Sequence, residues 1–173
     1  MPDPQRPDAH PVRFTVTDLD DPVARTLEQQ HSAEMSLRYG GGGEIAGPPI
    51  NAAQFRPPSG TFVVAWRNER PVACAGIRAL GGRRAELKRF FVAPEARRAG
   101  VGFAMLRAVE DLAREIGYAE LWLETGMEQP EALALYEQAG YTPIPPYGEY
   151  QDYEDSRCFA RPLTPRSSRA SSR

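Results

Sequence analysis

The feature that most constrains the fold of this chain is a long amphipathic pattern that runs from Ala99 to Gly117. Its apolar residues recur at steps of three and four, and they are Val101, Met105, Val109, Leu112 and Ile116. Its charged residues fall on the other side, and they are Arg107, Glu110, Asp111, Arg114 and Glu115. Within this set, Arg107–Asp111 and Glu110–Arg114 have the i,i+4 spacing of helical ion pairs. The pattern predicts a helix with one apolar and one charged face.

Strand-like and helical segments surround this helix in alternation. Before it, "TFVVAW" and "PVACAGIRAL" read as a hairpin joined by "RNER", and the turn "GGRR" leads into a strand "AELKRFFV". After it come a strand "AELWLET", a helix "PEALALYEQAG" ending in Gly140, a short strand "YTPI" and a last strand "SRCFARPL". Helices and strands that alternate in this way predict a mixed α/β sheet.

The first part of the chain adds one strand and one helix. "VRFTVTD" alternates apolar and polar residues, as a strand does. A helix follows, with Asp20 or Asp21 as its cap, Pro22 in its first turn and Gly40 at its end. Residues 40–60 are rich in Gly and Pro and predict a long loop that is functional or disordered.

The length of 173 residues suits a single domain. We expect it to span residues 12–163, between Pro- and Ser-rich tails at 1–11 and 164–173 that are expected to be disordered. The net charge of −2 gives no electrostatic case for binding nucleic acid or an anionic membrane. Cys74 and Cys158 have neither metal-ligand nor disulfide spacing, and no apolar run reaches the length of a membrane span. We therefore expect a cytoplasmic protein with free thiols, no bound metal and no membrane partner.

The segment "RRAGVG", residues 97–102, places two glycines at the start of the long helix. Glycine in a helix costs about 0.5–1 kcal/mol relative to alanine, so a bare backbone there needs a reason. One reason is phosphate binding by the free amides of a helix start, and the alternative is a tight turn beside two solvated arginines. A Walker A loop is excluded because Phe103 follows Gly102, and a Rossmann fingerprint because Met105 replaces its third glycine.

The stretch "FFVAPEARRAGVGFAMLRAVEDLAREIGY" resembles the acetyl-CoA-binding segment of the GNAT superfamily of N-acyltransferases. The signature of that family is Gln or Arg, two residues, Gly, one residue, then Gly or Ala, here Arg97, Gly100 and Gly102. "LWLETGMEQPEALALYEQAGY" is similar to the next strand and helix of the family, which carry a tyrosine, here Tyr136. Many members have Asn seven residues before that tyrosine, where this chain has Gln129.

The resemblance implies a mostly antiparallel sheet of six to seven strands with flanking helices, splayed between the fourth and fifth strands. Acetyl-CoA would lie across that opening, with its pyrophosphate on the amides at 97–102 and its thioester carbonyl near the backbone of Phe91 and Val92. The cofactor-binding residues implied in this way are Phe91, Val92, Arg97, Arg98, Ala99, Gly100, Val101, Gly102 and Gln129. We expect direct transfer in a ternary complex, carried out by a monomer or a homodimer.

Two catalytic residues are candidates within this resemblance. Glu86 lies eleven residues before Arg97, the spacing of the base in the histone-acetylating branch, but it also suits a strand glutamate paired with Lys88. Glu124 is a second candidate base, at the end of the fifth strand. Tyr136 would donate its hydroxyl proton to the departing sulfur of CoA, or else fill the core between helix and sheet.

The acceptor is predicted to be the amine of a small molecule such as an amino acid, a polyamine or an antibiotic-like amine. Its pocket would form from residues 38–55 and 143–156, where three tyrosines and several carboxylates suit a cation. Four cationic side chains could instead bind the carboxylate of an amino-acid acceptor, and they are Arg38, Arg78, Lys88 and Arg89. Two alternatives remain: acetylation of a protein N-terminus or lysine, and a non-catalytic acyl-CoA-binding regulator.

Overall fold

The computed structural model describes residues 11–40 and 50–165 of the chain. The strands are β1 (Arg13–Thr17), β2 (Thr61–Arg67), β3 (Arg70–Gly81), β4 (Arg84–Val92), β5 (Glu120–Gly126), β6 (Thr142–Ile144) and β7 (Ser156–Pro162). The α-helices are α1 (Pro22–Arg38), α2 (Val101–Ile116) and α3 (Pro130–Gln138), and the 3-10 helices are η1 (Ala52–Phe55), η2 (Pro94–Ala96) and η3 (Gly148–Asp152). The tails predicted to be disordered lie almost entirely outside the described residues, as does most of the first half of the predicted loop.

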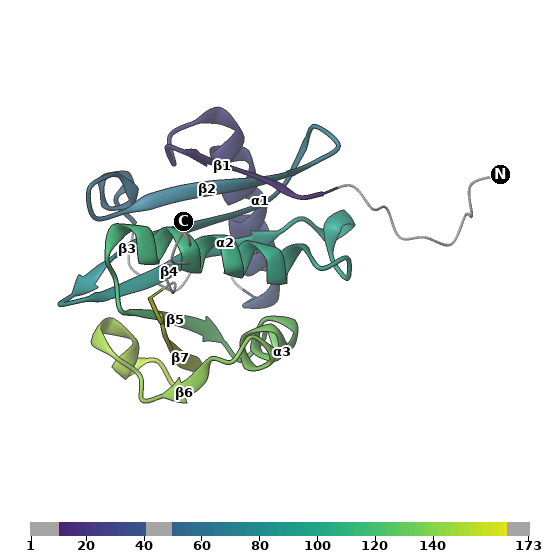
Figure 1. The fold of residues 1–173 in the computed structure, drawn as a ribbon. Coiled ribbons are helices and arrows are strands. Elements are labelled where there is room, and N and C mark those ends of the chain that lie inside the picture. The colour runs from purple at the N-terminus through teal and green to yellow at the C-terminus, as the bar shows by residue number, and fades with distance from the viewer. Residues whose placement is uncertain (1–10, 41–49, 166–173) are drawn as a thin grey trace, which may run out of the picture.

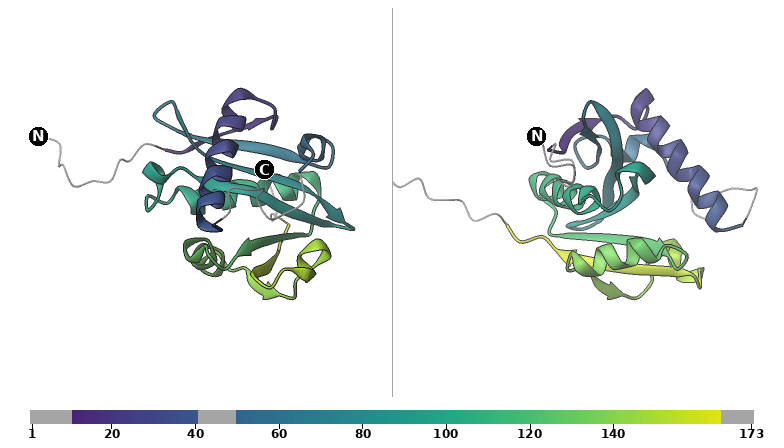
Figure 2. Two further views of the ribbon diagram at one scale, coloured as in Figure 1. Left: turned by 180° about the vertical axis from the view of Figure 1, so that it is seen from behind. Right: turned by 90° about the vertical axis from the view of Figure 1, so that its right-hand side faces the viewer.

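The strands form one mixed sheet in the order β1-β2-β3-β4-β5-β7-β6 (Figure 1). Neighbours are antiparallel except β4 and β5, which are parallel. Helix α2 covers one face of the sheet and α1 the other, as the views in Figures 1 and 2 show together. The predicted mixed, mostly antiparallel α/β fold is confirmed.

The parallel pair separates part of the way along its length. Pairing runs from Arg84–Glu120 to Leu87–Leu123, after which β4 continues to Val92 and β5 to Gly126 without each other. The cause lies in β4, where the register against β3 shifts between Lys88 and Phe91. Arg89 has a left-handed backbone there, with φ of 56°. A bulge of this kind bends its strand and increases the local twist, so it turns the end of β4 away from β5.

The helix ends follow local chemistry. The N–H of Val23 donates to Oδ1 of the cap residue Asp21 at 2.9 Å, and Gly40 follows α1 with φ of 69°, as predicted. Helix α2 begins at Val101, two residues later than predicted. Arg98 and Gly100 have φ of 59° and 77°, a left-handed conformation that cannot continue a right-handed helix.

Side-chain alternation divides β4 and β5 between two environments. Ala85 and Leu87 point into the core beneath α2, together with Leu121 and Leu123 of β5. The residues between them therefore point to the α1 face. Glu86 and Lys88 of β4 and Trp122 and Glu124 of β5 thus share one face of the sheet, on either side of the place where the strands separate.

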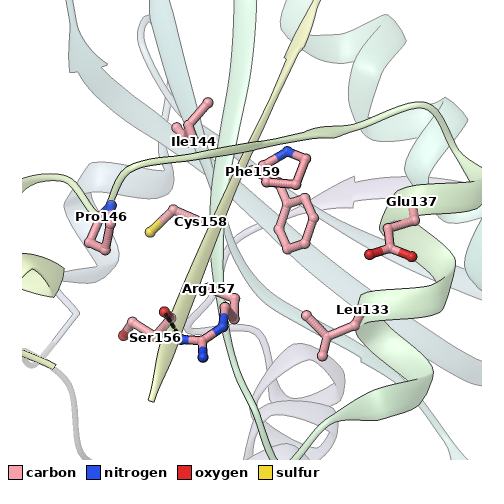
Figure 3. A pocket seen from close by; sticks show the side chains of 9 residues that line it. Leu133, Glu137, Ile144, Pro146, Ser156, Arg157, Cys158 and Phe159 are labelled. Carbon is pink, nitrogen blue, oxygen red and sulfur yellow. Dashed lines mark hydrogen bonds between the residues drawn. The ribbon is translucent and has the colours of Figure 1, made fainter. Parts of the chain in front are cut away.

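A pocket of about 460 Å³ lies where α3 meets the β7–β6 edge (Figure 3). Its walls are Leu133, Glu137, Pro143, Ile144, Pro146, Ser156, Arg157, Cys158 and Phe159. Four of them lie in the segment 143–156 that was predicted to line the acceptor pocket, and they are Pro143, Ile144, Pro146 and Ser156. None of the walls is one of the predicted cofactor-binding or catalytic residues.

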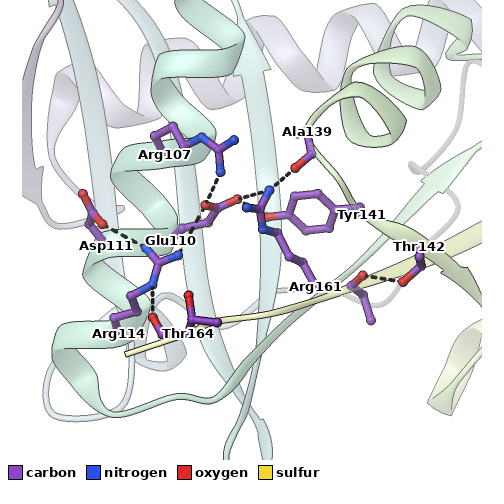
Figure 4. A network of polar contacts seen from close by, with 10 residues as sticks. Arg107, Glu110, Asp111, Arg114, Ala139, Tyr141, Thr142, Arg161 and Thr164 are labelled. Carbon is purple, nitrogen blue, oxygen red and sulfur yellow. Dashed lines mark hydrogen bonds and ion pairs between the residues drawn. The ribbon is translucent and has the colours of Figure 1, made fainter. Parts of the chain in front are cut away.

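The burial of Glu110 shows that the predicted division of α2 into an apolar and a charged face was wrong at this position. Glu110 was placed on the charged, solvent-facing side, but it is fully buried. Its carboxylate accepts hydrogen bonds from Arg107 Nη1 at 2.9 Å and from the hydroxyl of Tyr141 at 3.1 Å (Figure 4). Arg114 and Arg161 contribute nitrogens at 3.7 and 3.6 Å. Glu110 is buried because β7 and the end of α3 bring these partners over the helix, which a helical pattern cannot reveal.

Replacing Glu110 by alanine is expected to lower the free energy of unfolding by about 2–4 kcal/mol, because it removes the shared acceptor of a buried tyrosine and several guanidinium groups. Urea denaturation monitored by circular dichroism measures the change. Glu115→Ala, on the exposed side of the same helix, is the matched control and should cost less than about 0.5 kcal/mol. Equal effects of the two substitutions would contradict the role assigned to Glu110.

Candidate functional site

The loop 97–102 joins η2 to α2 and leaves the start of that helix uncapped. Gly100 is the N-cap, and no side chain bonds to the first turn. A Cβ built on Gly100 meets no atom within 4 Å, so the space in front of this helix end is open. A Cβ on Gly102 would lie 3.2 Å from Leu135 of α3, which makes packing a second reason for that glycine. The first amides of a helix carry partial positive charge, so an unobstructed helix start of this kind is suited to bind an anion.

The two arginines of this loop differ in their surroundings. Arg97 donates through Nε to the carbonyl of Val92 at 2.9 Å and through Nη2 to Glu34 of α1 at 2.5 Å. Arg38, one turn further along α1, bonds to Glu34 and pairs with Glu131 of α3. Arg98 is exposed. The charge that is available to a ligand here is therefore that of Arg98, while Arg97 links the loop to α1.

The other residues predicted to bind the cofactor lie around the separated strand ends. Phe91 is buried toward α1, and Val92, on the α2 side, presents its carbonyl to Arg97. The carbonyl of Ala99 accepts from Arg67 Nη2 at 3.1 Å, while Val101, the first residue of α2, is buried in the core. Gln129 is the cap residue of α3, and its amide nitrogen lies 3.4 Å from the hydroxyl of Tyr39. Apart from Gln129, these residues gather at the end of β4 and the start of α2.

Tyr136 lies on the α2 side, close to where β4 leaves β5. Its ring contacts Phe90 of β4 edge-to-face, with centroids 6.0 Å apart, and it also touches Tyr141 and Phe159. Its hydroxyl forms no hydrogen bond with the residues that the structure describes. Burial raises its pKa, so the phenol stays protonated at neutral pH and has a proton to donate.

Glu86 lies on the opposite face and is fully buried. Its Oε2 accepts from Arg78 Nε at 2.8 Å, and its Oε1 accepts from the hydroxyls of Tyr147 and Tyr150 at 2.9 and 2.8 Å. The alternative partner expected from the sequence, Lys88, instead donates to the hydroxyl of Tyr150 at 2.6 Å. Both oxygens of Glu86 are thus occupied by three donors.

Glu124 lies beyond the last β4–β5 pair on the same face as Glu86. The hydroxyl of Ser156 donates to its Oε1 at 2.7 Å. Burial raises the pKa of Glu124, while Ser156 and the charge of Lys88 oppose that rise. Burial has the opposite effect on a cation, and it lowers the pKa of Lys88. A carboxylate with a raised pKa and one committed oxygen is suited to accept a proton.

Other chemistries find little support among the described residues. Burial raises the pKa of Cys158 to about 11 and that of Cys74 above its usual range, so both stay thiols at neutral pH. No group of three or more metal-ligating side chains occurs within residues 11–40 and 50–165. Across the same ranges, no helix has the length and apolarity to cross a bilayer.

The sequence did not reveal how the segment before β7 covers Glu86. Tyr147 and Tyr150 come from η3 and its flank, and Tyr147 packs edge-on against Trp122 at 5.1 Å. Their composition suggested an acceptor wall, but the direction of their hydroxyls depends on the path of residues 145–155 over the sheet. The pairing of Arg78 with Glu86 could have been predicted from the sequence, because the register of the hairpin places these residues opposite each other on β3 and β4.

Comparisons with known proteins show which sequences and structures this chain resembles. A sequence model of the Acetyltransferase (GNAT) family matches residues 25–141. The "IAA acetyltransferase" of Azospirillum brasilense is 38% identical over 103 residues, which cover 59% of this chain and 67% of that protein. The "Aminoglycoside N(6')-acetyltransferase type 1" of Klebsiella aerogenes is 28% identical over 135 residues, 78% of this chain and 80% of that protein.

Solved structures share the fold. An acetyltransferase of the GNAT family from Staphylococcus aureus Mu50 superposes with a TM-score of 0.72 at 18% identity, covering 88% of this chain and 100% of that one. A GNAT family acetyltransferase from Elizabethkingia anophelis, solved with acetyl-CoA bound, gives a TM-score of 0.62 at 18% identity, with 88% and 98% covered.

Substituting Tyr150 by phenylalanine is expected to lower the free energy of unfolding by about 1–3 kcal/mol, because Lys88 loses its acceptor and Glu86 loses one of its donors. Thermal and urea denaturation measure the loss. Tyr153→Phe, three residues away at an exposed position, should leave stability unchanged. A Tyr150→Phe variant as stable as Tyr153→Phe would show that the hydroxyl network around Glu86 contributes nothing.

Proposed function

This chain belongs to the GNAT family of acetyltransferases, and from that premise we propose that it transfers an acetyl group from acetyl-CoA directly to the amine of a small molecule. The observation that carries the proposal is the coincidence of two features at the end of β4. The strand separates from β5 after Leu87. The start of α2, which has no side-chain cap, follows the end of β4 within ten residues. Such a site suits a long ligand with a diphosphate at one end.

Acetyl-CoA supplies the activated acetyl group when it is bound. The amides from Arg98 to Gly102 would hold its pyrophosphate, with the exposed side chain of Arg98 adding positive charge. Among the described residues, the backbone of β4 beyond the bulge has no partner strand on the β5 side. Apart from the Val92 carbonyl, which accepts from Arg97, its polar groups there would be available to the pantetheine chain and the thioester. Donors fixed at the thioester oxygen would stabilise the charge that develops during transfer.

We assign the role of general base to Glu124. An amine that attacks the thioester carbon forms the C–N bond and acquires a positive charge, and a base must remove one proton. Glu124 lies on the same face as the predicted acceptor wall and has a raised pKa, and its second oxygen accepts no hydrogen bond from the residues that the structure describes. Glu86 would have to release three donors to do the same, so its network fits a positioning role for Lys88 and the tyrosines.

Tyr136 is the proposed acid. It lies on the opposite face of the sheet from Glu124, so the two groups approach the opening from different sides. When the C–S bond breaks, the sulfur takes the electron pair, and the Tyr136 hydroxyl donates a proton that solvent later replaces. A thiol of pKa about 8.5 leaves readily as a thiolate, so this contribution is smaller than that of the base.

The names of two relatives support a small-molecule acceptor, because one names IAA and the other an aminoglycoside. The site adds aromatic and acidic walls from Tyr147, Tyr150 and Glu124 that suit an amine. The Gly-rich segment that would distinguish a small acceptor from a protein one includes residues 41–49, which lie outside the described residues. Location in the cytoplasm remains a prediction.

Gly100→Ala is expected to weaken acetyl-CoA binding at least tenfold, because the added methyl group lies where the pyrophosphate approaches the amides. Gly82→Ala is the matched control, since Gly82 also has a positive φ, 59°, and open space around its Cβ. Both variants should lose about 1–2 kcal/mol of stability from backbone strain. The rise in melting temperature with acetyl-CoA separates them, and an undiminished rise for Gly100→Ala would exclude this phosphate site.

Glu124→Gln should lower kcat by about 10²–10⁴. In the wild type, kcat/KM should fall as the pH drops through the raised pKa of Glu124, because the protonated carboxyl cannot act as a base, and the variant should lack this limb. Release of free CoA thiol measures both. Glu86→Gln is the comparison: a loss of that acidic limb in Glu86→Gln but not in Glu124→Gln would reverse the assignment.

A further inference from the structure

Two buried polar atoms lack partners where α1 packs on the bulge of β4. They are Nε of Arg89 and Nδ1 of His31, neither of which forms a hydrogen bond with any residue in the described ranges 11–40 and 50–165. Buried polar groups in folded proteins are nearly always paired, so two unpaired ones in one contact region require an explanation. A third such atom, Nε of Arg67, belongs to a different place, the loop carrying Ala99.

Arg89 reaches the α1 face from the bulge itself. Its Nη1 lies 3.6 Å from Oε1 of Glu28, which is beyond hydrogen-bond range, and that oxygen already accepts from Ser32 at 2.9 Å. Only 15% of the side chain of Arg89 is exposed. The guanidinium therefore directs Nη1 toward Glu28, while the N–H of its Nε has no partner among the described residues. A guanidinium edge of this kind matches the two oxygens of a carboxylate.

His31 stands beside this group from α1, with its ring centroid 5.8 Å from that of Phe91. Burial lowers its pKa to about 4, and the neighbouring charges of Arg89 and Lys88 act in the same direction, against that of Glu34. The imidazole is therefore neutral at pH 7, and Nδ1 can carry the proton and donate it in a hydrogen bond. His31 therefore adds no positive charge to this region, and the charge there comes from Arg89 and Lys88.

The other cations on this face are already engaged. Arg78 bonds to Glu86 and lies 3.5 Å from Glu149, and Lys88 donates to Tyr150. Among the cationic side chains of β3 and β4 that point to the α1 face, Arg89 is thus the one with a buried donor to spare. Glu124 faces the same side from β5, across the separation of the strands. Positive charge on β4 and negative charge on β5 match a ligand that carries both.

We propose that Arg89, assisted by Nδ1 of His31, binds the carboxylate of the acceptor while the amine of the same molecule faces Glu124, so that the acceptor is a free amino acid. This inference rests on the acetyl transfer proposed above and names its substrate class. Amines without an acidic group would bind the Glu124 side alone. Arg89 would then determine specificity, and the bulge that opens the sheet would also place the residue that selects the acceptor.

The test compares free L-amino acids with the same amino acids as carboxamides, using CoA thiol release with the full chain. We expect kcat/KM to be at least tenfold higher for the acids, mainly through KM. Arg89→Gln should raise KM for the acids at least tenfold and leave the carboxamides within about twofold. Arg70→Gln, at the exposed first residue of β3, should change neither series. Circular dichroism and melting temperature verify that each variant is folded.

Equal rates for acids and carboxamides, or equal losses of both in Arg89→Gln, would overturn the inference while leaving acetyl transfer intact. A chain that acetylates no amine and gains no thermal stability from acetyl-CoA would instead overturn the proposed function. A binding measurement independent of turnover completes the test: saturation-transfer NMR should detect N-acetylglycine, but not N-acetylglycinamide, on the wild type with CoA. Signals that are equal for both, or that persist in Arg89→Gln, also contradict the carboxylate site.

Discussion

The separation of β4 from β5 is the constraint on which the rest of the site depends. It follows from the extra residue in β4 at the left-handed position Arg89, which ends the parallel pairing at Leu87–Leu123. Backbone groups that a continuous sheet would have paired become available to a ligand. The same kink determines which side chains point to which face beyond it. The separation of the strand ends and the placement of Arg89 on the α1 face are thus consequences of one irregularity in one strand.

Two fully buried glutamates serve different purposes in this framework. Glu110 joins α2 to β7 and to the residues after α3 through arginines that remain partly exposed, so it stabilises the arrangement of layers. Glu86 lies under the segment that precedes β7 and determines where the hydroxyls of Tyr147 and Tyr150 point. A buried carboxylate with both oxygens hydrogen-bonded has a fixed position, whereas within the described residues Glu124 accepts from Ser156 through one oxygen alone, which is why we propose it as the base.

Much of this architecture was predictable from the sequence, and the reasons are local. The alternation around β2–β4, the cap at Asp21 and the glycines after α1 and α3 act over a few residues, and the predicted elements formed within one or two residues of their expected ends. Contacts between distant segments were not predictable. The burial of Glu110 depends on Tyr141 and Arg161, and the partners of Glu86 come from a segment some sixty residues away. Hydrophobic periodicity carries no information about such partners.

Helix α1 connects the two sides of the opening through charge. Glu34 pairs with Arg97 in the loop between η2 and α2. Arg38, one turn later in α1, bonds to Glu34 and pairs with Glu131 at the start of α3, beyond the end of β5. Helix α1 therefore bridges the loop that precedes α2 and the start of α3, which follow the two diverging strands in the chain. Because Arg97 and Arg38 share the carboxylate of Glu34, a substitution of this one residue would remove a contact on each side of the opening.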